Sequence, residues 1–237
     1  QEVRKKIELL VLLLALAGIY TVSRNLEKYV QSDQVKSEQE RKMDLVVIDS
    51  GHGGSDPGKV GINEVLEKDI NLKISKQVGK ELKNKGYQVV MTREKDQMLA
   101  GETSGNSKIQ DMKARVDLIN EKAPGLAVSI HQNSYHEEEI HGAQVFYYSH
   151  SAEGHTAAKL MQQALLGADS ENTRQEKAND TYYLLRRTQV PTIIVECGFL
   201  SNQQEAELLA GKDYQKKIAK AIATGIDEYL RNAADGT

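Results

Sequence analysis

The chain has 237 residues, of which 39 % are apolar and 27 % are charged, so a collagen-like or wholly disordered protein is not expected. Its formal net charge of −3 argues against nucleic acid as a partner, because phosphate binding favours a basic surplus. The single cysteine, Cys197, excludes an intramolecular disulfide framework and a zinc site made of several thiolates. The composition therefore indicates a globular protein.

Residues 1–22 have the pattern of an export signal. Three basic residues, Arg4, Lys5 and Lys6, precede an uncharged run at 9–19, which is shorter than the roughly 20 residues that cross a bilayer as a helix. The triplet that ends at Ala17 has the small-x-small pattern of a cleavage site. An uncleaved anchor and a short buried helix are the alternatives. We expect a signal peptide or an N-terminal membrane anchor that contacts the membrane, and a protein that acts outside the cytoplasm.

A polar segment, 23–43, contains neither glycine nor proline, and this composition indicates a partly helical spacer. Beyond it, at 44–232, β-rich runs alternate with runs of helical periodicity. Strands are predicted at 44–49, 88–92, 126–130, 143–148 and 192–195. Helices are predicted at 69–82, 109–119, 156–166, 205–209 and 214–230. Segments 96–108 and 169–181 have the composition of loops. This alternation predicts an α/β fold: a single domain with a largely parallel, twisted sheet flanked by helices on both faces.

Side chains that can bind a ligand or transfer a proton through nitrogen or oxygen atoms follow three of the predicted strands. His52 comes after the first strand, and His131 and Glu196 directly follow two later ones. A fourth candidate, Glu67, precedes the first predicted helix. Because ligands bind beyond the carboxyl ends of parallel strands, we expect these groups to share one edge of the sheet.

These four side chains suit zinc hydrolysis. A catalytic zinc ion takes three nitrogen or oxygen ligands from the protein, and His52, Glu67 and His131 form such a set. A free carboxylate must then accept a proton from the attacking water and return it to the leaving amine, a role that suits Glu196. Spacing along the chain is weak evidence for this set by itself.

Other readings of the same residues remain open. The GHGG segment at 51–54 fits a plain turn or a phosphate-binding loop, although it lacks the lysine of a P-loop. His136 and His141 are further candidate ligands, but their five-residue spacing and the acidic run between them favour a solvated loop. Glu64 competes with Glu67 as a ligand. Cys197 has no triad pattern around it, which favours a buried side chain over a nucleophile.

Four motifs occur at 46–58, 61–72, 129–134 and 195–202: VVIDSGHGGSDPG, GINEVLEKDINL, SIHQNS and VECGFLSN. Together they resemble the zinc-dependent amidase 3 family of N-acetylmuramoyl-L-alanine amidases, in the family's order. Each motif is weak alone, but four in register are specific, and the resemblance extends over about 45–229. It is nearest to the sporulation and germination type, which carries an export signal and no cell-wall repeat module.

The resemblance implies a role for each matching residue. His52, Glu67 and His131 correspond to the ligands of one zinc ion, which favours Glu67 over Glu64, and Glu196 corresponds to the catalytic glutamate. Asn133 is expected to orient a ligand or contact substrate. Ser50 stands where the family usually has proline, and Asn63 and Glu64 replace a commoner small residue. These departures remove no reacting group.

The implied reaction is hydrolysis of the amide between N-acetylmuramic acid and L-alanine in peptidoglycan. In a spore-forming bacterium, this step precedes muramic-δ-lactam formation in the cortex and serves germination. Some related sporulation amidases work with an accessory lipoprotein, so such a partner is expected beside peptidoglycan. A catalytically silent peptidoglycan-binding or regulatory domain and a zinc peptidase that acts within the stem peptide are the alternatives.

Overall fold

The computed structural model describes residues 2–4, 16, 18–26, 43–101 and 106–235. The chain divides into two units, 1–41 and 42–237. In the first unit, residues 18–26 are helical. Most of the apolar run at 9–19 and most of the spacer at 23–43 lie outside the described residues, so the signal or anchor and the spacer stay predictions. Among the described residues, no helix has both the length and the apolar character needed to cross a membrane.

The second unit is built on one sheet, and the described residues form six strands in the order β2-β1-β3-β6-β4-β5. The strands are β1 (Leu45–Ser50), β2 (Gln88–Met91), β3 (Leu126–Asn133), β4 (Gln144–Tyr147), β5 (Lys177–Ala178) and β6 (Thr192–Phe199). Strands β2, β1, β3 and β6 are parallel, and β4 runs antiparallel to β6. The largely parallel sheet is therefore confirmed.

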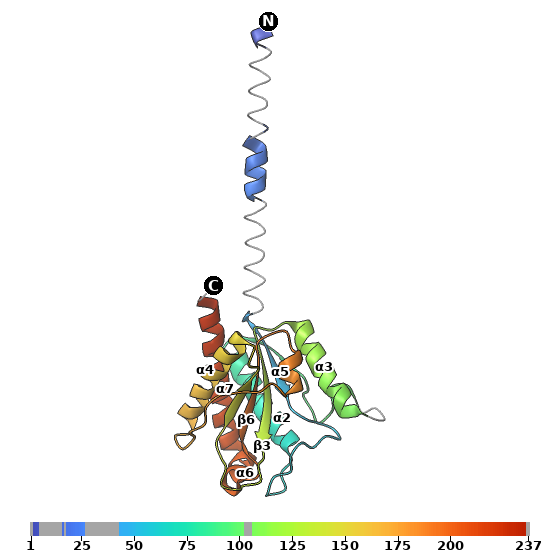
Figure 1. Ribbon diagram of the computed structural model, residues 1–237, viewed down its shortest axis with the longest axis vertical. Helices are drawn as coiled ribbons and strands as arrows, with labels where there is room; N and C mark the ends of the chain where they lie inside the picture. Colours follow the sequence, from blue (N-terminus) through green and yellow to red (C-terminus); the bar gives the residue numbers. More distant parts are fainter. Residues whose placement is uncertain (1, 5–15, 17, 27–42, 102–105, 236–237) are drawn as a thin grey trace. The chain divides into compact units, whose positions relative to one another are not determined.

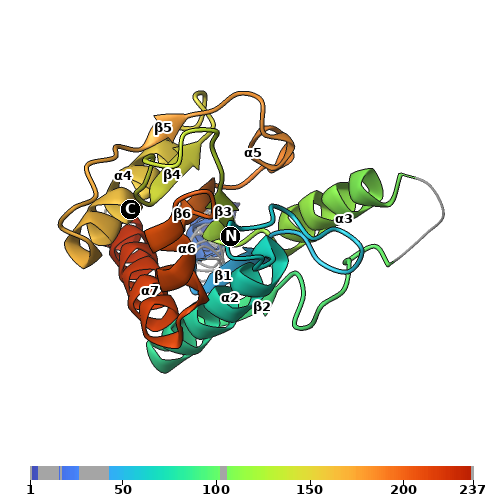
Figure 2. The ribbon, with the colours of Figure 1, turned by 90° about the horizontal axis from the view of Figure 1, so that it is seen from below.

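Helices cover both faces of this sheet (Figures 1 and 2). The helices are α2 (Glu67–Asn84), α3 (Ser107–Lys122), α4 (Ala152–Ala168), α5 (Tyr183–Arg187), α6 (Gln203–Ala210) and α7 (Lys212–Asp235). Val46 and Ile48 of β1 belong to the core shared with α2, α4, α6 and α7. Val47, between them, belongs to the core shared with α3 and α5. The alternation of side chains along β1 thus supplies both cores, as the predicted two-faced fold requires.

The structure differs from the sequence prediction mainly at element ends. Strands β3 and β6 continue past their apolar runs, and their pairing reaches His131 opposite Glu196 and Asn133 opposite Phe199. His131 and Glu196 are therefore inside strands rather than after them. These two polar side chains face a pocket rather than an apolar core, so the apolar pattern from which each strand was predicted stops before them. Short elements β5 and α5 were not predicted, and β5 lies in a segment predicted as a loop.

Candidate functional site

A pocket of about 530 Å³ opens at the carboxyl ends of β1, β3 and β6. All four candidate residues line it: His52, Glu67, His131 and Glu196. His52 lies in the turn after β1, Glu67 is the first residue of α2, and the other two come from adjacent strands. The sheet edge therefore brings together groups that are up to 144 positions apart in the chain, 196 minus 52.

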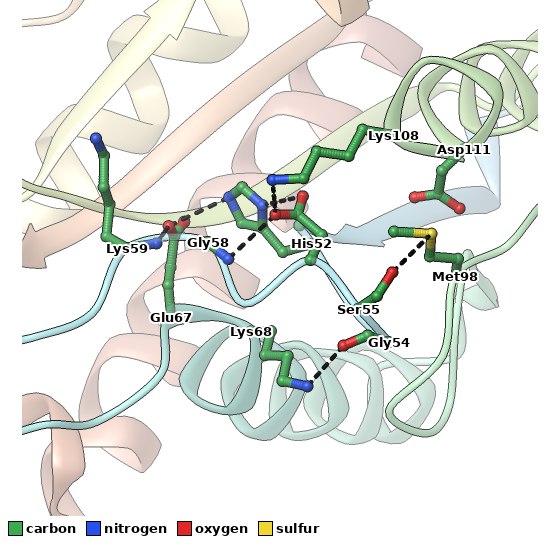
Figure 3. Close-up of polar contacts among 12 residues, drawn as sticks. His52, Gly54, Ser55, Gly58, Lys59, Glu67, Lys68, Met98, Lys108 and Asp111 are labelled. Atoms are coloured by element: carbon green, nitrogen blue, oxygen red, sulfur yellow. Dashed lines mark hydrogen bonds and ion pairs between the residues drawn. The ribbon is translucent and has the colours of Figure 1, made fainter. Parts of the chain in front are cut away.

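Three of these side chains form a cluster that can hold a metal ion. The ligand atoms of His52, Glu67 and His131 all lie within 4.8 Å of one another. Glu67 Oε1 is 2.9 Å from His131 Nδ1. Glu67 Oε2 is 3.2 Å from His52 Nε2, and these two side chains face one another in Figure 3. Two imidazole nitrogens and a carboxylate, all converging on one point, are a donor set that suits zinc.

Glu67 is held as a carboxylate inside the protein. Its side chain is 2 % exposed, and the backbone N–H groups of Lys59 and Gln132 donate to it over 2.8 and 3.1 Å. Burial raises its pKa, but hydrogen bonds from His131 and His52 outweigh burial and hold the pKa well below its ordinary value. Glu67 is thus an anion before any cation binds beside it.

The same carboxylate acts on His131. Burial lowers the pKa of His131, but the hydrogen bond and the charge of Glu67 outweigh it and raise the pKa to about 9. Imidazole ligates a metal only in its neutral form, so a cation that binds here must displace the proton of His131. Metal binding at this cluster is therefore expected to weaken as the pH falls.

The turn that carries His52 has an unusual backbone. His52 adopts a φ of 61° and the following Gly53 a φ of 136°, both in the left-handed region. The His52 ring packs edge-on against that of His131, with 5.0 Å between the ring centroids. A non-glycine residue in this region costs of the order of 1–3 kcal/mol, so surrounding contacts must hold it there.

Two buried arginines provide these contacts, and we call them, with the carbonyls that they bind, the turn clamp. Arg93 donates from Nε to the carbonyl of Ser50 over 2.9 Å and from Nη2 to that of Gly51 over 3.0 Å. Arg115 donates to the carbonyl of Ser50 over 2.8 Å and to that of His52 over 2.8 Å. Both arginines are 2 % exposed. The clamp therefore fixes the backbone that presents the first candidate ligand.

Sequence reasoning missed the turn clamp. One signal for it existed in α3, where Asp111, Arg115 and Ile119 follow one another at intervals of four and share the buried face. A charged pair on an inward-facing helical stripe is costly unless it has a buried task. Arg93 offered no such signal, because it lies in an irregular segment after β2.

We expect the substitution Arg115→Met to lower the free energy of unfolding by about 3–5 kcal/mol, since it leaves Asp49 as a buried carboxylate without its cation. Arg115 Nη1 lies 2.6 Å from Asp49 Oδ1, and both side chains are almost fully buried. Urea unfolding measures the change. Lys122→Met on the same helix, which breaks an exposed pair with Glu121, should cost at most about 1 kcal/mol. Equal losses for the two variants would contradict a structural role for the buried pair.

The Asp49 carboxylate also predicts an acid dependence. Burial raises its pKa, but the charge of Arg115 and hydrogen bonds from Ser129 and Thr92 outweigh burial and lower the pKa from 3.8 to about 2. A lowered pKa stabilises the fold fully above the unfolded value, and this stabilisation is lost as the pH falls toward about 2. Unfolding measured between pH 5 and pH 2, in steps of about half a unit, should show this loss in the wild type and less of it in Arg115→Met.

Glu196 differs from the cluster beside it. It is 7 % exposed, and its Oε2 has no hydrogen-bond partner among the described residues. Burial raises its pKa to about 7, assisted by the charge of Glu67 and opposed by that of His131. A pocket carboxyl group that titrates near neutrality can both accept and donate a proton at physiological pH.

The structure separates the other candidates from this cluster. His136 is 70 % exposed and lies 3.4 Å from Glu137. His141 contributes its backbone carbonyl to Arg174. Neither histidine, nor Glu64, belongs to the described group that can hold a metal. The solvated-loop reading therefore fits His136, and His141 is not among the described residues that line the pocket.

Two further predictions concern neighbours of the site. Cys197 is fully buried, and burial raises the pKa of its thiol, which disfavours a nucleophilic thiolate and fits the buried side chain that was predicted. Asn133 lines the pocket, where its Oδ1 accepts a hydrogen bond of 2.8 Å from the backbone of Ser134. The side-chain amide of Asn133 therefore lies at the pocket wall.

Sequence reasoning also missed Asp56. It follows His52 in the same turn, and Asp56 Oδ2 lies 2.8 Å from His52 Nδ1. Lys108 extends from α3 toward the ring of His52 (Figure 3) and pairs with the other oxygen of Asp56 over 2.6 Å. Aspartate is common in turns, so the sequence alone could not distinguish a capping role from a contact with a ligand.

Known proteins resemble this chain over most of its length. The family model described as N-acetylmuramoyl-L-alanine amidase matches residues 46–228. The germination-specific N-acetylmuramoyl-L-alanine amidase of Bacillus subtilis (strain 168) is 40 % identical over 194 residues, which are 81 % of this chain and 81 % of that protein.

Solved structures show the same fold. The CwlD amidase of Clostridioides difficile, in a complex with the GerS lipoprotein, has a TM-score of 0.76 and 36 % identity, covering 79 % of this chain and 98 % of that one. The catalytic domain of CwlV, an N-acetylmuramoyl-L-alanine amidase of Bacillus (Paenibacillus) polymyxa var. colistinus, has a TM-score of 0.70 and 31 % identity, covering 79 % and 98 %.

Proposed function

The chain belongs to the N-acetylmuramoyl-L-alanine amidase family and is a peptidoglycan amidase, and we propose that His52, Glu67 and His131 hold its single zinc ion while Glu196 transfers the proton. The bond cleaved is the amide between N-acetylmuramic acid and the L-alanine of the stem peptide. The observation that carries the proposal is one pocket that contains both a converging donor set and a separate, unpartnered carboxyl oxygen among the described residues.

The donor set fits zinc in its chemistry. Two imidazoles and one carboxylate are a set found in zinc hydrolases, and they leave a fourth position for water or substrate. When bound, zinc supplies Lewis acidity that polarises a carbonyl and makes water more acidic. Glu67 is already ionised by its surroundings, so it binds a cation without first losing a proton.

Glu196 then moves the proton. In its ionised form it accepts a proton from the water that attacks the amide carbonyl. It next donates that proton to the alanine nitrogen as the bond to carbon breaks, which avoids the expulsion of an amide anion. Asn133 lies at the pocket wall, where it can orient a ligand or bind the substrate. Burial raises the pKa of Glu196 toward neutrality, which helps this carboxyl group to hold the proton between the two halves of the transfer.

The biological setting extends this proposal. The substrate lies outside the cytoplasmic membrane, so the enzyme acts there, with residues 1–22 as its signal peptide or anchor. The similarity to a germination-specific amidase and to the CwlD amidase supports action on the spore cortex, before muramic-δ-lactam formation and germination. The structure of CwlD in complex with the GerS lipoprotein supports an accessory lipoprotein as a partner for this chain.

Mass spectrometry of digested peptidoglycan tests the proposal. The full chain, stripped of metal with a chelator, is incubated with purified peptidoglycan with and without added zinc. We expect free stem peptides that begin at L-alanine, together with a peptide-free glycan, only when zinc is present. Products cut within the stem would identify a peptidase instead. Zinc binding without any cleavage would favour a binding role or a missing partner.

A further inference from the structure

Asp56 is fixed in place by its own backbone. It exchanges two hydrogen bonds with Gly53 across the turn, since Gly53 N–H donates to the Asp56 carbonyl over 3.0 Å and Asp56 N–H donates to the Gly53 carbonyl over 3.1 Å. The next carbonyl, that of Pro57, accepts the N–H of Lys68 in the first turn of α2. The position of this aspartate is therefore tied both to the turn of His52 and to the helix of Glu67.

Each carboxylate oxygen of Asp56 has its own partner. Oδ2 is 2.8 Å from His52 Nδ1, while Oδ1 pairs with Lys108 Nζ over 2.6 Å and accepts a longer bond of 3.4 Å from the N–H of Gly58. With both oxygens engaged, the carboxylate cannot rotate freely. The side chain is 16 % exposed, so water competes weakly for these contacts.

This arrangement determines which nitrogen of His52 is available. An ionised carboxylate can only accept a hydrogen bond, and His52 faces one at each ring nitrogen, Asp56 at Nδ1 and Glu67 Oε2 at Nε2 over 3.2 Å. When a metal ion takes the place of the hydrogen on Nε2, the remaining ring hydrogen is on Nδ1, where Asp56 accepts it. A carboxylate that fixes the tautomer of a histidine ligand in this way also raises its basicity toward a metal.

We propose that Asp56 is a positioning residue that holds His52 in the Nδ1–H tautomer and directs Nε2 into the metal cluster. The inference rests on the proposed metal role of His52, and it adds that zinc affinity depends on a residue that does not touch the metal. Lys108 supports it by occupying the second oxygen of Asp56.

Asp96, in the segment after β2, contacts the same turn and offers a matched control. This carboxylate accepts the N–H of Gly54 over 2.8 Å and pairs with Lys68 over 2.7 Å, so it also joins an acidic side chain to the turn and to a lysine. It is 47 % exposed and is not part of the metal-holding group among the described residues. Asp96→Ala therefore perturbs the turn without altering the contact to His52.

The test measures zinc affinity of the full chain by competition with a chromophoric chelator. We expect Asp56→Ala to weaken zinc binding about 10- to 100-fold and Asp56→Asn, which keeps an acceptor, to weaken it less. Asp96→Ala should change affinity by no more than about fivefold. In ¹H–¹⁵N correlation spectra of zinc-loaded protein, the Nδ1–H of His52 should exchange slowly with water in the wild type and rapidly in Asp56→Ala, while thermal melting confirms that each variant is folded.

The outcomes separate this inference from the proposed function. Equal zinc affinity in the wild type and Asp56→Ala, or equal weakening in Asp56→Ala and Asp96→Ala, would overturn the positioning role and leave the metal site standing. A wild-type chain that binds no zinc would overturn the proposed metal role of His52, and the inference with it. A slowly exchanging Nδ1–H of His52 in a folded, zinc-loaded Asp56→Ala variant would also count against it.

Discussion

The substitution Glu196→Gln is expected to lower the rate of amide hydrolysis about 10²- to 10⁴-fold while zinc affinity stays near that of the wild type. Glutamine has nearly the same volume but cannot accept the proton of the attacking water. The carboxyl group of Glu196 is outside the metal-holding group, and its Oε2 has no partner among the described residues, so the change breaks no described hydrogen bond of that oxygen. The loss should therefore appear in turnover and not in metal binding.

Release of stem peptides, quantified by mass spectrometry at saturating substrate, measures this loss, and chelator competition measures zinc affinity. Glu137→Gln is the control, because Glu137 is an exposed carboxylate whose described ion pair is with His136. Turnover of Glu196→Gln equal to that of the wild type would remove Glu196 from the proposed mechanism.

The pH profile gives a second readout of the same residue. A base must be ionised, so the rate should fall as the pH drops through the pKa of Glu196. That pKa is about 7 from burial, and a cation in the neighbouring cluster would shift it downward by favouring the carboxylate. With zinc held at a saturating concentration at each pH, we expect an acid limb at or below about pH 7 in the wild type and its disappearance from the residual activity of Glu196→Gln.

The second large effect is expected at Gly51, just before His52. A Cβ atom on Gly51 would overlap the imidazole ring of His131. The backbone cannot retreat, because Gly51 N–H donates to the Ile130 carbonyl over 3.1 Å and its own carbonyl accepts from Arg93 in the turn clamp. Gly51→Ala must therefore displace the ring of His131 from the cluster.

We expect Gly51→Ala to weaken zinc binding, to lower activity by about 10²-fold or more, and to destabilise the fold by about 1–3 kcal/mol. Gly167→Ala is the control, since a Cβ there meets nothing within 4 Å and the residue lies in α4. This control should be neutral or stabilising by up to about 1 kcal/mol.

A double variant keeps the prediction testable if Gly51→Ala unfolds. Removing the ring with His131→Ala should relieve the overlap, so Gly51→Ala should cost much less stability in the His131→Ala background than in the wild type. Equal costs in the two backgrounds would show that the ring is not what the new methyl group meets. Unchanged zinc affinity of folded Gly51→Ala would contradict the predicted displacement.

Much of the fold could be predicted because its physical signals are local. The inner strands are apolar runs, since a parallel sheet covered on both faces buries every side chain of β1 after Leu45. Helices α2 and α7 carry the apolar periodicity of a face that packs on the sheet. The antiparallel direction of β4 could not be predicted from the sequence. Strand direction depends on how the chain returns to the sheet, and the apolar pattern of the strand does not record it.

The candidate site could be predicted from the sequence only in part. His52, His131 and Glu196 could be found because strand ends meet at one edge of a sheet, whatever their separation in the chain. The roles of Arg93 and Asp56 could not, because each acts through contacts with backbone or ring atoms of residues that only folding brings near, and the spacing in α3 indicated a buried Arg115 without its backbone partners. Residue types that are ordinary at the surface have no sequence signature for such tasks.

The turn clamp has a consequence for how the enzyme is activated. In a zinc finger the metal itself organises the chain, so removing it unfolds the protein. Here guanidinium groups bind the carbonyls of Ser50, Gly51 and His52, so protein atoms alone maintain the shape of the turn. We therefore expect the chain to stay folded when the proposed zinc ion is removed, so that loading of the site would control activity separately from folding.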